Sequence, residues 1–472
     1  MTPVPSPQGH SSRPQPAPGQ PTPLRRRSAV RQRQRPVPLT VLCGFDRHAV
    51  ADAAAALLLA GSRLALIWAD PFTAELGYVQ TRVTDSDGRC TDQAVGLGHD
   101  CVSCTLHAAI ARTVRRLRRT GRYDAILIHL HPGIEADAAI DVLAADLTGL
   151  AVVDTVALSL HSGWLDDLDG DATALARGIA LTGDDDRFAA PILAAALAAA
   201  TVVIAPPGPG RGSDLVERAL PVENALLSIL APDAIRLYPA TPFDVTTTQI
   251  VRTGRFRPEM LDPLASRALL DPRHTLPAAC GSLRLVRWRA GRPIHPQRLH
   301  GAIAELADGV IRSTGYLRLA TRPHQVVYWD SAGSSLVLGL PETVPAAPAG
   351  IPGNSRRPQH RPAEHHPSGL RQPAGNHLAF LGSDLDSEHI QQVLDSCLLT
   401  DTELCAGPAA WRHLDDPFPR WDEDHGSTAA DRPAPDARQP TPRPTQHDLL
   451  CPPGGRAGRY PDGQAPESRS GR

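Results

Sequence analysis

The sequence predicts an α/β protein with two folded parts, a parallel-sheet domain followed by a smaller α+β domain. Two observations support this fold class. From residue 38 onward, short segments that are apolar throughout alternate with helical segments, as in parallel strands that are covered on both faces and joined by crossover helices. From about Gly281 the order becomes strand, helix, strand, strand, which is typical of an α+β module.

The strands expected in the first domain are short and rich in Val, Ile, Leu and Ala. They are expected at residues 39–43, 64–68, 78–84, 125–130, 152–160 and 201–204. Helices are expected at residues 49–59 and 106–117, with further helices between the later strands. Strands that alternate with helices in this way pair in parallel, because each crossover returns the chain to the same end of the sheet.

The second domain is expected to mix strands and helices. Strands are expected at residues 282–288, 315–320 and 326–329, and helices at 299–307 and 386–399. The segment from Trp411 to Trp421 carries three aromatic side chains in a chain with only 4% aromatic residues. We expect this segment to pack onto the helix at 386–399, although the same aromatic residues would also suit the docking of a partner.

Proline marks the boundaries, because its 47 residues are concentrated in a few stretches. We expect a disordered basic arm at 1–37, an insert at 341–376 and a disordered tail at 422–472, since these stretches offer little apolar surface to bury. The folded domains then cover residues 38–245 and 281–421, and residues 246–280 connect them.

Composition limits the function classes. The formal net charge is −2, which argues against a globally basic nucleic-acid binder. The sequence has no run of eighteen apolar residues and no apolar segment at its start, so we expect no contact with a membrane. Eight unevenly spaced cysteines fit a reduced, cytoplasmic protein, in which unpaired thiols or metal ligands are expected rather than disulfides.

Two cysteines, Cys101 and Cys104, stand three residues apart after a turn and at the start of an expected helix. The helix dipole favours the thiolate that binds metal. Zinc takes four thiolate or imidazole ligands, and we expect His99 and Cys43 to supply the other two, with Cys90 in a loop as a weaker candidate. Two alternatives remain open: ordinary buried thiols that shape a turn, and a redox dithiol.

The segment Cys101–Leu106 resembles the Gly-Cys-x-Cys-Cys-Thr-Leu signature of the CobW-like metallochaperone GTPases, with Ser103 in place of the middle cysteine. In the second half, Arg292–Leu299 looks like the Arg-Pro-Phe start of a helix in that family, and Gly309–Tyr316 looks like its Arg-x-Lys-Gly strand entry. Over residues 38–421 the resemblance implies a P-loop GTPase-like domain followed by a CobW C-terminal-type domain.

The resemblance is closer to an actinobacterial branch of this family that is tied to zinc starvation and alternative ribosomes. The matching segments are Cys101–Thr105, Arg292–His300, and Asp416–Phe418 followed by Trp421. It implies an adaptor that recruits a hibernation factor to the ribosome when zinc is scarce. The competing function is a GTP-dependent zinc or cobalt metallochaperone, and a third is a scaffold with neither metal nor nucleotide.

A phosphate-binding loop of this family requires a lysine, and the sequence contains none. The corresponding loop begins at Gly44 and keeps only that glycine, and the Asp46 charge would repel phosphates. Arg47 and His48 are the remaining candidates for nucleotide contact, although the Arg47 guanidinium is too long and forked to replace a lysine ammonium.

The two other nucleotide-binding elements are also altered. His129 stands where the family has a carboxylate, and Pro132 lacks the backbone N–H that would meet the γ-phosphate. No side chain of residues 205–208 has the groups that read guanine. The sequence therefore predicts a pseudo-GTPase in which GTP binding is doubtful, zinc is the expected cofactor, and catalytic activity stays an open question.

The expected helix at 106–117 continues into an arginine stripe. Arg112, Arg115 and Arg119 share one face at helical spacing, and Arg116 lies beside them. Such a stripe either contacts RNA, as a ribosome-linked protein would, or forms the solvated side of an amphipathic helix. The acidic segments at 166–169 and 184–186 are expected to be solvent-facing loops, because their spacing does not fit a calcium loop.

Overall fold

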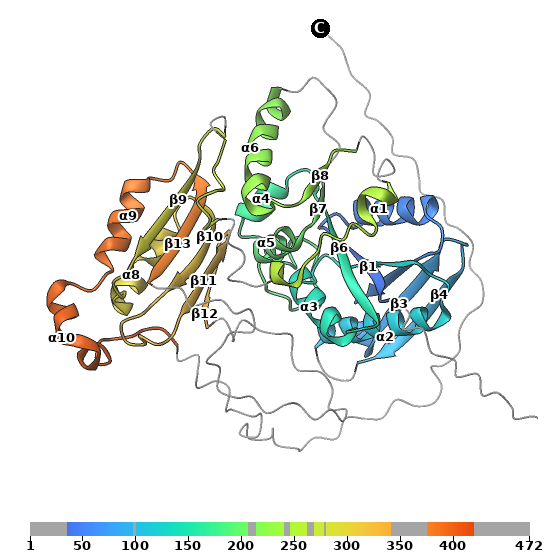
Figure 1. The fold of residues 1–472 in the computed structure, drawn as a ribbon, viewed down its shortest axis with the longest axis horizontal. Helices are drawn as coiled ribbons and strands as arrows, with labels where there is room; N and C mark the ends of the chain where they lie inside the picture. The colour runs from blue at the N-terminus through green and yellow to red at the C-terminus, as the bar shows by residue number, and fades with distance from the viewer. Residues whose placement is uncertain are drawn as a thin grey trace, which may run out of the picture. The chain divides into compact units, whose positions relative to one another are not determined.

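Two β-sheets organise the chain (Figure 1). This computed structural model describes residues 35–97, 101–205, 214–239, 246–261, 269–277, 280–340 and 375–419. The strands of the first sheet lie between Val37 and Leu237, and those of the second lie between Leu283 and Ser383. The predicted order of an α/β part followed by an α+β part is confirmed.

The first sheet has eight strands in the order β4-β3-β2-β5-β1-β6-β7-β8. Six of the eight strands pair in parallel, namely β2, β5, β1, β6, β7 and β8. The other two, β3 and β4, pair antiparallel at one edge of the sheet. The strands are β1 (Val37–Cys43), β2 (Leu64–Asp70), β3 (Tyr78–Asp85), β4 (Cys90–Gly96), β5 (Ala125–His129), β6 (Ala151–Ser159), β7 (Val202–Ile204) and β8 (Ile235–Leu237). Cys90 was expected in a loop, but it begins β4 and is exposed.

Strand β1 lies at the centre of this sheet, and its two faces are both buried. Leu42 packs with Val50 and Leu57 of helix α1, whereas Val41 belongs to the core on the opposite face with Ile110 of helix α2. Because both faces of the strand are covered, its sequence is apolar throughout instead of alternating. This covering is the reason the central strands could be recognised in the sequence.

The helices of the first domain divide between the two faces. Helix α1 (Arg47–Ala60) and the short α7 (Thr247–Ile250) share one core with the sheet. Several helices contribute to the core of the other face: α2 (Val102–Thr120), α3 (Ala136–Asp146), α4 (Trp164–Asp169), α5 (Ala189–Ala199) and α6 (Asp214–Leu230). Two short 3-10 helices, Ala74–Leu76 and Pro258–Leu261, complete this part.

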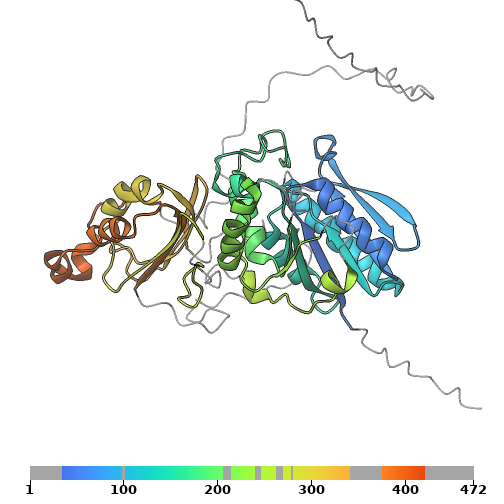
Figure 2. The ribbon, with the colours of Figure 1, turned by 90° about the horizontal axis from the view of Figure 1, so that it is seen from above.

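The second sheet has five antiparallel strands in the order β12-β11-β10-β13-β9. They are β9 (Leu283–Ala290), β10 (Val310–Leu317), β11 (Val327–Ala332), β12 (Ser335–Gly339) and β13 (Asn376–Ser383). Helices α8 (Pro296–Leu306) and α9 (Ser387–Ser396) cover one face of this sheet, and α10 (Asp401–Trp411) follows (Figure 2). Strands β12 and β13 were not expected from the sequence.

The segment after α10 returns to the second domain. Phe418 is buried, contacts the ring of His300 on α8 at 5.7 Å and shares a core with Leu394 of α9. Asp416 anchors the segment by accepting a hydrogen bond from Thr321 and pairing with Arg322 at 3.1 Å. Aromatic packing and one half-buried ion pair therefore hold the last described residues in place.

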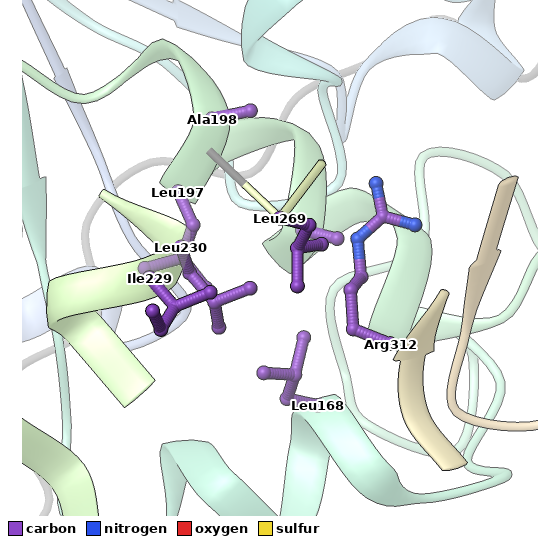
Figure 3. Close-up of a pocket in the computed structure, with 8 residues that line it drawn as sticks. Leu168, Leu197, Ala198, Ile229, Leu230, Leu269 and Arg312 are labelled. Carbon is purple, nitrogen blue, oxygen red and sulfur yellow. The ribbon is translucent and has the colours of Figure 1, made fainter. Parts of the chain in front are cut away.

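A small pocket lies among apolar side chains of α4, α5 and α6 and next to Arg312 of β10 (Figure 3). Arg312 is buried, and its guanidinium pairs with Asp330 at 2.6 Å and donates to the Ser313 carbonyl at 3.2 Å. A buried arginine needs such partners, because an unpaired charge in an apolar site is costly. None of the described helices is both long and apolar enough to cross a membrane.

Candidate functional site

The candidate site lies at the carboxyl edge of the first sheet. Strands β2, β5, β1 and β6 are consecutive neighbours there, and they end at Asp70, His129, Cys43 and Ser159. The turns that follow these strands therefore meet at one edge. Helix α1 begins at this edge directly after β1. Helix α2 also begins there, because it runs to the opposite edge of the sheet, where the parallel strand β5 starts. Ligands of open parallel sheets bind at this edge.

The turn between β1 and α1 depends on Gly44. Its φ of +150° is a conformation that L side chains rarely adopt, and a Cβ at this position would be 2.3 Å from the Ser159 carbonyl oxygen. The next residue, Phe45, is buried and its ring stacks on His161 at 6.2 Å. The predicted loop glycine is therefore required by its close contact with the end of β6.

Asp46 occupies the N-terminus of α1 with its own carboxylate. Its Oδ1 accepts hydrogen bonds from the backbone N–H groups of His48, at 2.9 Å, and Ala49, at 3.0 Å. Backbone N–H groups at a helix N-terminus are the donors that hold phosphate in nucleotide-binding loops. In this chain two of these donors are already bonded to an anion, and the sequence has no lysine to add to them.

Arg47 and His48 are the first two residues of α1, directly after the turn that Gly44 begins. The Arg47 guanidinium is 4.6 Å from the centre of the Phe72 ring, in a cation–π contact. His48 is exposed. The sequence analysis missed Phe72, which follows the end of β2 and is 58% exposed. An aromatic residue directly after a strand end was the signal that could have identified it.

His129 and His131 are both buried at this edge, with 4% and 2% exposure. The His129 ring stacks on Trp68 of β2 at 5.7 Å, and the His131 ring meets the Phe72 ring edge-on at 5.7 Å. Burial, and secondarily the charge of Arg47, lowers the pKa of each histidine to about 4. Both imidazoles are therefore neutral at pH 7.

The tautomer of His131 follows from its hydrogen bond. The Gly133 backbone N–H donates to Nδ1 of His131 at 3.2 Å, so the proton of the neutral ring resides on Nε2. Among the described residues, neither this Nε2 nor the Nε2 of His129 has a hydrogen-bond partner. A buried polar atom without a partner costs about 1–3 kcal/mol. These two nitrogen atoms are consequently suited to contact a polar group of a ligand.

Charged side chains bridge the loops near the site. Asp167 pairs with Arg177 at 2.6 Å and with His161 at 2.7 Å. Asp185 pairs with Arg187 at 2.8 Å. Both aspartates are buried, so the expectation that the two acidic segments are wholly solvent-facing is wrong at these positions. Burial alone would raise the pKa of each carboxyl, but the hydrogen bonds it accepts lower the pKa below its usual value.

Cys101 and Cys104 come together at the start of α2. Their sulfur atoms are 2.9 Å apart, and Cys101 caps the helix because its Sγ accepts the Cys104 backbone N–H at 3.3 Å. Burial, followed by the contact with Cys101, raises the pKa of the Cys104 thiol to about 12. The direction of this shift is opposite to that of the helix dipole, which favours the thiolate. A bound metal would have to displace the Cys104 proton.

Cys43 does not join this pair. It is buried, its Sγ donates to the Ala157 carbonyl at 3.7 Å, and burial raises its pKa to about 12. His99 lies outside the described residues. Within the part of the chain that the structure describes, no three His, Cys, Asp or Glu side chains are grouped to hold a metal. Two thiols of the predicted zinc site are in place, and the four-ligand site stays a prediction.

The arginines of the stripe on α2 fall into two groups, those that hydrogen-bond to neighbouring elements and those that are exposed. Arg115 donates to the Asp146 carbonyl at 2.8 Å, and Arg118 donates to the Leu150 carbonyl at 2.5 Å. These two side chains connect α2 to the end of α3 and to the residue directly before β6. Arg112, Arg116 and Arg119 are exposed. The exposed arginines are the part of the stripe that is accessible to a partner.

The neutral, buried histidines predict a pH-dependent stability. In the unfolded chain the histidine pKa is about 6.5, whereas His129 and His131 have a pKa of about 4 in the folded chain. The unfolded state therefore binds more protons in this range. We expect the free energy of unfolding to be highest above pH 6.5 and to fall toward pH 4, by on the order of 3 kcal/mol for each histidine.

Urea unfolding at a series of pH values measures this effect. His131→Gln should make the free energy of unfolding fall less steeply between pH 6.5 and pH 4, because it removes the contribution of one buried histidine. The same change at the exposed His48 should leave this fall unchanged. His107 and His377, whose pKa values burial also lowers to about 4, account for part of the remaining slope. An equal slope in the wild type and in His131→Gln would contradict the buried, neutral state of His131.

Comparison with known proteins places this chain in a family. The family model for the cobalamin synthesis protein cobW C-terminal domain matches residues 283–398, which begin with β9 and end just after α9. A structural alignment with the Zn(II)-bound YjiA GTPase from E. coli covers 77% of this chain and 99% of that chain, with a TM-score of 0.33 and 12% sequence identity.

Two curated relatives match most of the chain. The zinc-regulated GTPase metalloprotein activator 1 of Dictyostelium discoideum is 25% identical over 374 residues, which cover 73% of this chain and 73% of that protein. The zinc chaperone Rv0106 of Mycobacterium tuberculosis is 30% identical over 379 residues, which cover 74% of this chain and 86% of that protein. By this extended similarity, and by the family model over its second domain, the chain belongs to the CobW-like family.

Proposed function

We propose that this chain acts in zinc homeostasis as a nucleotide-impaired adaptor of the CobW-like family. The observation that carries the proposal is the Asp46 carboxylate, which accepts the His48 and Ala49 backbone N–H groups at the start of α1. A phosphate at this place would have to displace that carboxylate or lie beside it. Like charges at such a distance repel each other, and no lysine offsets the repulsion.

The surrounding side chains support the same conclusion. Neutral His129 stands where the family has a carboxylate, and Pro132 lacks the backbone N–H that would meet the γ-phosphate. The Arg47 guanidinium packs on Phe72, which restrains it from serving as a substitute for the lysine. GTP hydrolysis needs these groups together, because its transition state is stabilised almost entirely by positioned charge.

The zinc part of the proposal rests on the dithiol and on the relatives. Cys101 and Cys104 place two half-buried sulfur atoms together at the start of α2. Two thiolates hold zinc more weakly than a complete four-ligand site does, which suits reversible binding of a cargo ion. Rv0106 is named a zinc chaperone, and the Dictyostelium relative is named a zinc-regulated metalloprotein activator.

The partner part of the proposal rests on the resemblance to the zinc-starvation branch. In this proposal the chain recruits a hibernation factor to the ribosome when zinc is limiting. Arg112, Arg116 and Arg119 on the exposed side of α2 would contact ribosomal RNA. The alternative is a GTP-dependent zinc or cobalt metallochaperone, which the dithiol favours and the altered nucleotide loop disfavours.

The nucleotide part is tested with labelled GTP. We expect no saturable binding at low micromolar concentration and no GTP turnover by the wild type. Asp46→Gly should destabilise the protein by only about 0.3 kcal/mol, since glycine is tolerated as an N-cap, and should strengthen GTP binding, because it releases two N–H groups and removes a negative charge. Asp46→Asn is the matched control, since an asparagine keeps the cap. Clear turnover by the wild type would favour the metallochaperone alternative.

The metal part is tested by measuring zinc content and zinc affinity. We expect the reduced wild type to bind zinc and the double variant Cys101→Ser/Cys104→Ser to lose that zinc, because serine hydroxyls are poor zinc ligands. The matched control replaces the exposed Cys90 and Cys405 with serine and should retain zinc. If both double variants bind zinc as the wild type does, the dithiol is not the zinc site.

The partner part is tested by co-sedimentation with purified actinobacterial ribosomes in zinc-depleted buffer. Replacing Arg112, Arg116 and Arg119 with alanine should weaken co-sedimentation several-fold and should reduce its salt dependence. A variant with alanine at Arg82, Arg89 and Arg273 is the control, since it removes the same charge from exposed arginines that pair with carboxylates. An equal loss in both variants would indicate a nonspecific charge effect, and no co-sedimentation of the wild type would refute the ribosome-linked role.

A further inference from the structure

Three polar side chains form a row across the second sheet, far along the chain from the site described above. The strand register pairs Arg289 of β9 with His377 of β13, and His377 with Tyr316 of β10. Residues that are directly opposite in neighbouring antiparallel strands project to the same face. Leu285 and Ala379 of that face belong to the larger core, whereas α8 and α9 cover the other face.

Hydrogen-bond contacts join the three side chains of this row. The Arg289 Nε–H donates to Nε2 of His377 at 2.8 Å, and the Tyr316 hydroxyl lies 3.4 Å from Nδ1 of the same ring. Because Nε2 accepts, Nδ1 carries the proton of the neutral imidazole. His377 is buried, so this arrangement holds the Arg289 side chain in one place by its Nε. The two terminal amino groups of the guanidinium make no hydrogen bond to any described residue.

The positive charge of this row is not balanced by a paired carboxylate of the described residues. Arg287 lies two residues before Arg289 on the same face, and its guanidinium donates to the carbonyls of Leu269 and His274. Burial and the Arg289 charge lower the pKa of Arg287, although the Asp271 charge opposes them. Asp271 itself pairs with Arg273 at 2.5 Å. Among the described residues, no carboxylate pairs with Arg287 or Arg289.

The row forms one wall of an open cavity of about 330 Å³. Gly291 and Asn376 also line it. Asn376 is held in place, because its Nδ2 donates to the Ala290 and Arg292 carbonyls at 3.2 and 2.7 Å and its Oδ1 accepts from the Arg318 N–H at 2.7 Å. The cavity thus has a rigid rim, an oriented guanidinium and space for a ligand larger than an ion.

We propose that the Arg289–His377–Tyr316 row is a binding site for the oxyanion group, phosphate or carboxylate, of a small molecule. A guanidinium with two available amino groups presents parallel N–H donors that match two oxygens of either group. The neighbouring charge of Arg287 adds attraction without a direct contact. The site belongs to the second domain and uses no residue of the nucleotide loop or of the dithiol.

Isothermal titration of the full chain tests the site with three probes: inorganic phosphate, adenosine monophosphate and citrate. We expect saturable binding of at least one probe with a Kd below about 1 mM. Arg289→Gln should weaken this binding about tenfold, as for loss of a charge-assisted hydrogen bond. Arg284→Gln is the matched control, since Arg284 is an exposed residue of the same strand, and its binding should match the wild type.

The probes also distinguish the ligand class, because stronger binding of phosphate and the nucleotide indicates a phosphorylated ligand and stronger binding of citrate indicates a carboxylate. Perturbation of the His377 ring signals in an NMR titration would place the bound probe at the row. The absence of saturable binding by all three probes would overturn the proposal. Binding that Arg289→Gln leaves unchanged, or that Arg284→Gln weakens equally, would also overturn it.

Discussion

The hydrogen bonds between the Asp46 carboxylate and the start of α1 constrain the whole carboxyl edge of the first sheet. They fix the turn that Gly44 begins, and the close contact of Gly44 with the Ser159 carbonyl keeps that turn against the end of β6. A helix N-terminus carries a partial positive charge that attracts an anion. This chain supplies the anion from its own sequence, so the edge is complete without a phosphate.

The side chains around Asp46 form a site of unusual chemistry for a nucleotide-binding fold. Two neutral histidines pack on aromatic rings there, His129 on Trp68 and His131 on Phe72, and the Arg47 guanidinium lies over the same Phe72 ring. Such a surface offers little stabilisation to the multiple negative charges of a triphosphate. The packing of the fold is retained at this edge, and that packing alone does not determine which chemistry the site performs.

The central strands and most helices could be predicted because burial on both faces leaves a continuous apolar run in the sequence. Strand β4 could not, since six of its seven residues are not buried. Strand β13 follows the proline-rich insert and pairs with β9 and β10, which lie far from it in sequence. At the site, the residues of the nucleotide loop and the dithiol were predictable by motif. The capping role of Asp46 and the stacking of Phe72 were not, because both depend on how separate strand ends meet.

Helices α1 and α2 both begin at this edge and are each capped by a side chain, but the two caps differ in chemistry. Asp46 caps α1 with a carboxylate oxygen, which accepts the His48 and Ala49 backbone N–H groups. Cys101 caps α2 with a sulfur atom whose lone pairs a zinc ion would also use. A zinc-bound thiolate keeps lone pairs that accept a backbone N–H, so a zinc ion and the Cys104 N–H can share that sulfur at the first turn of α2.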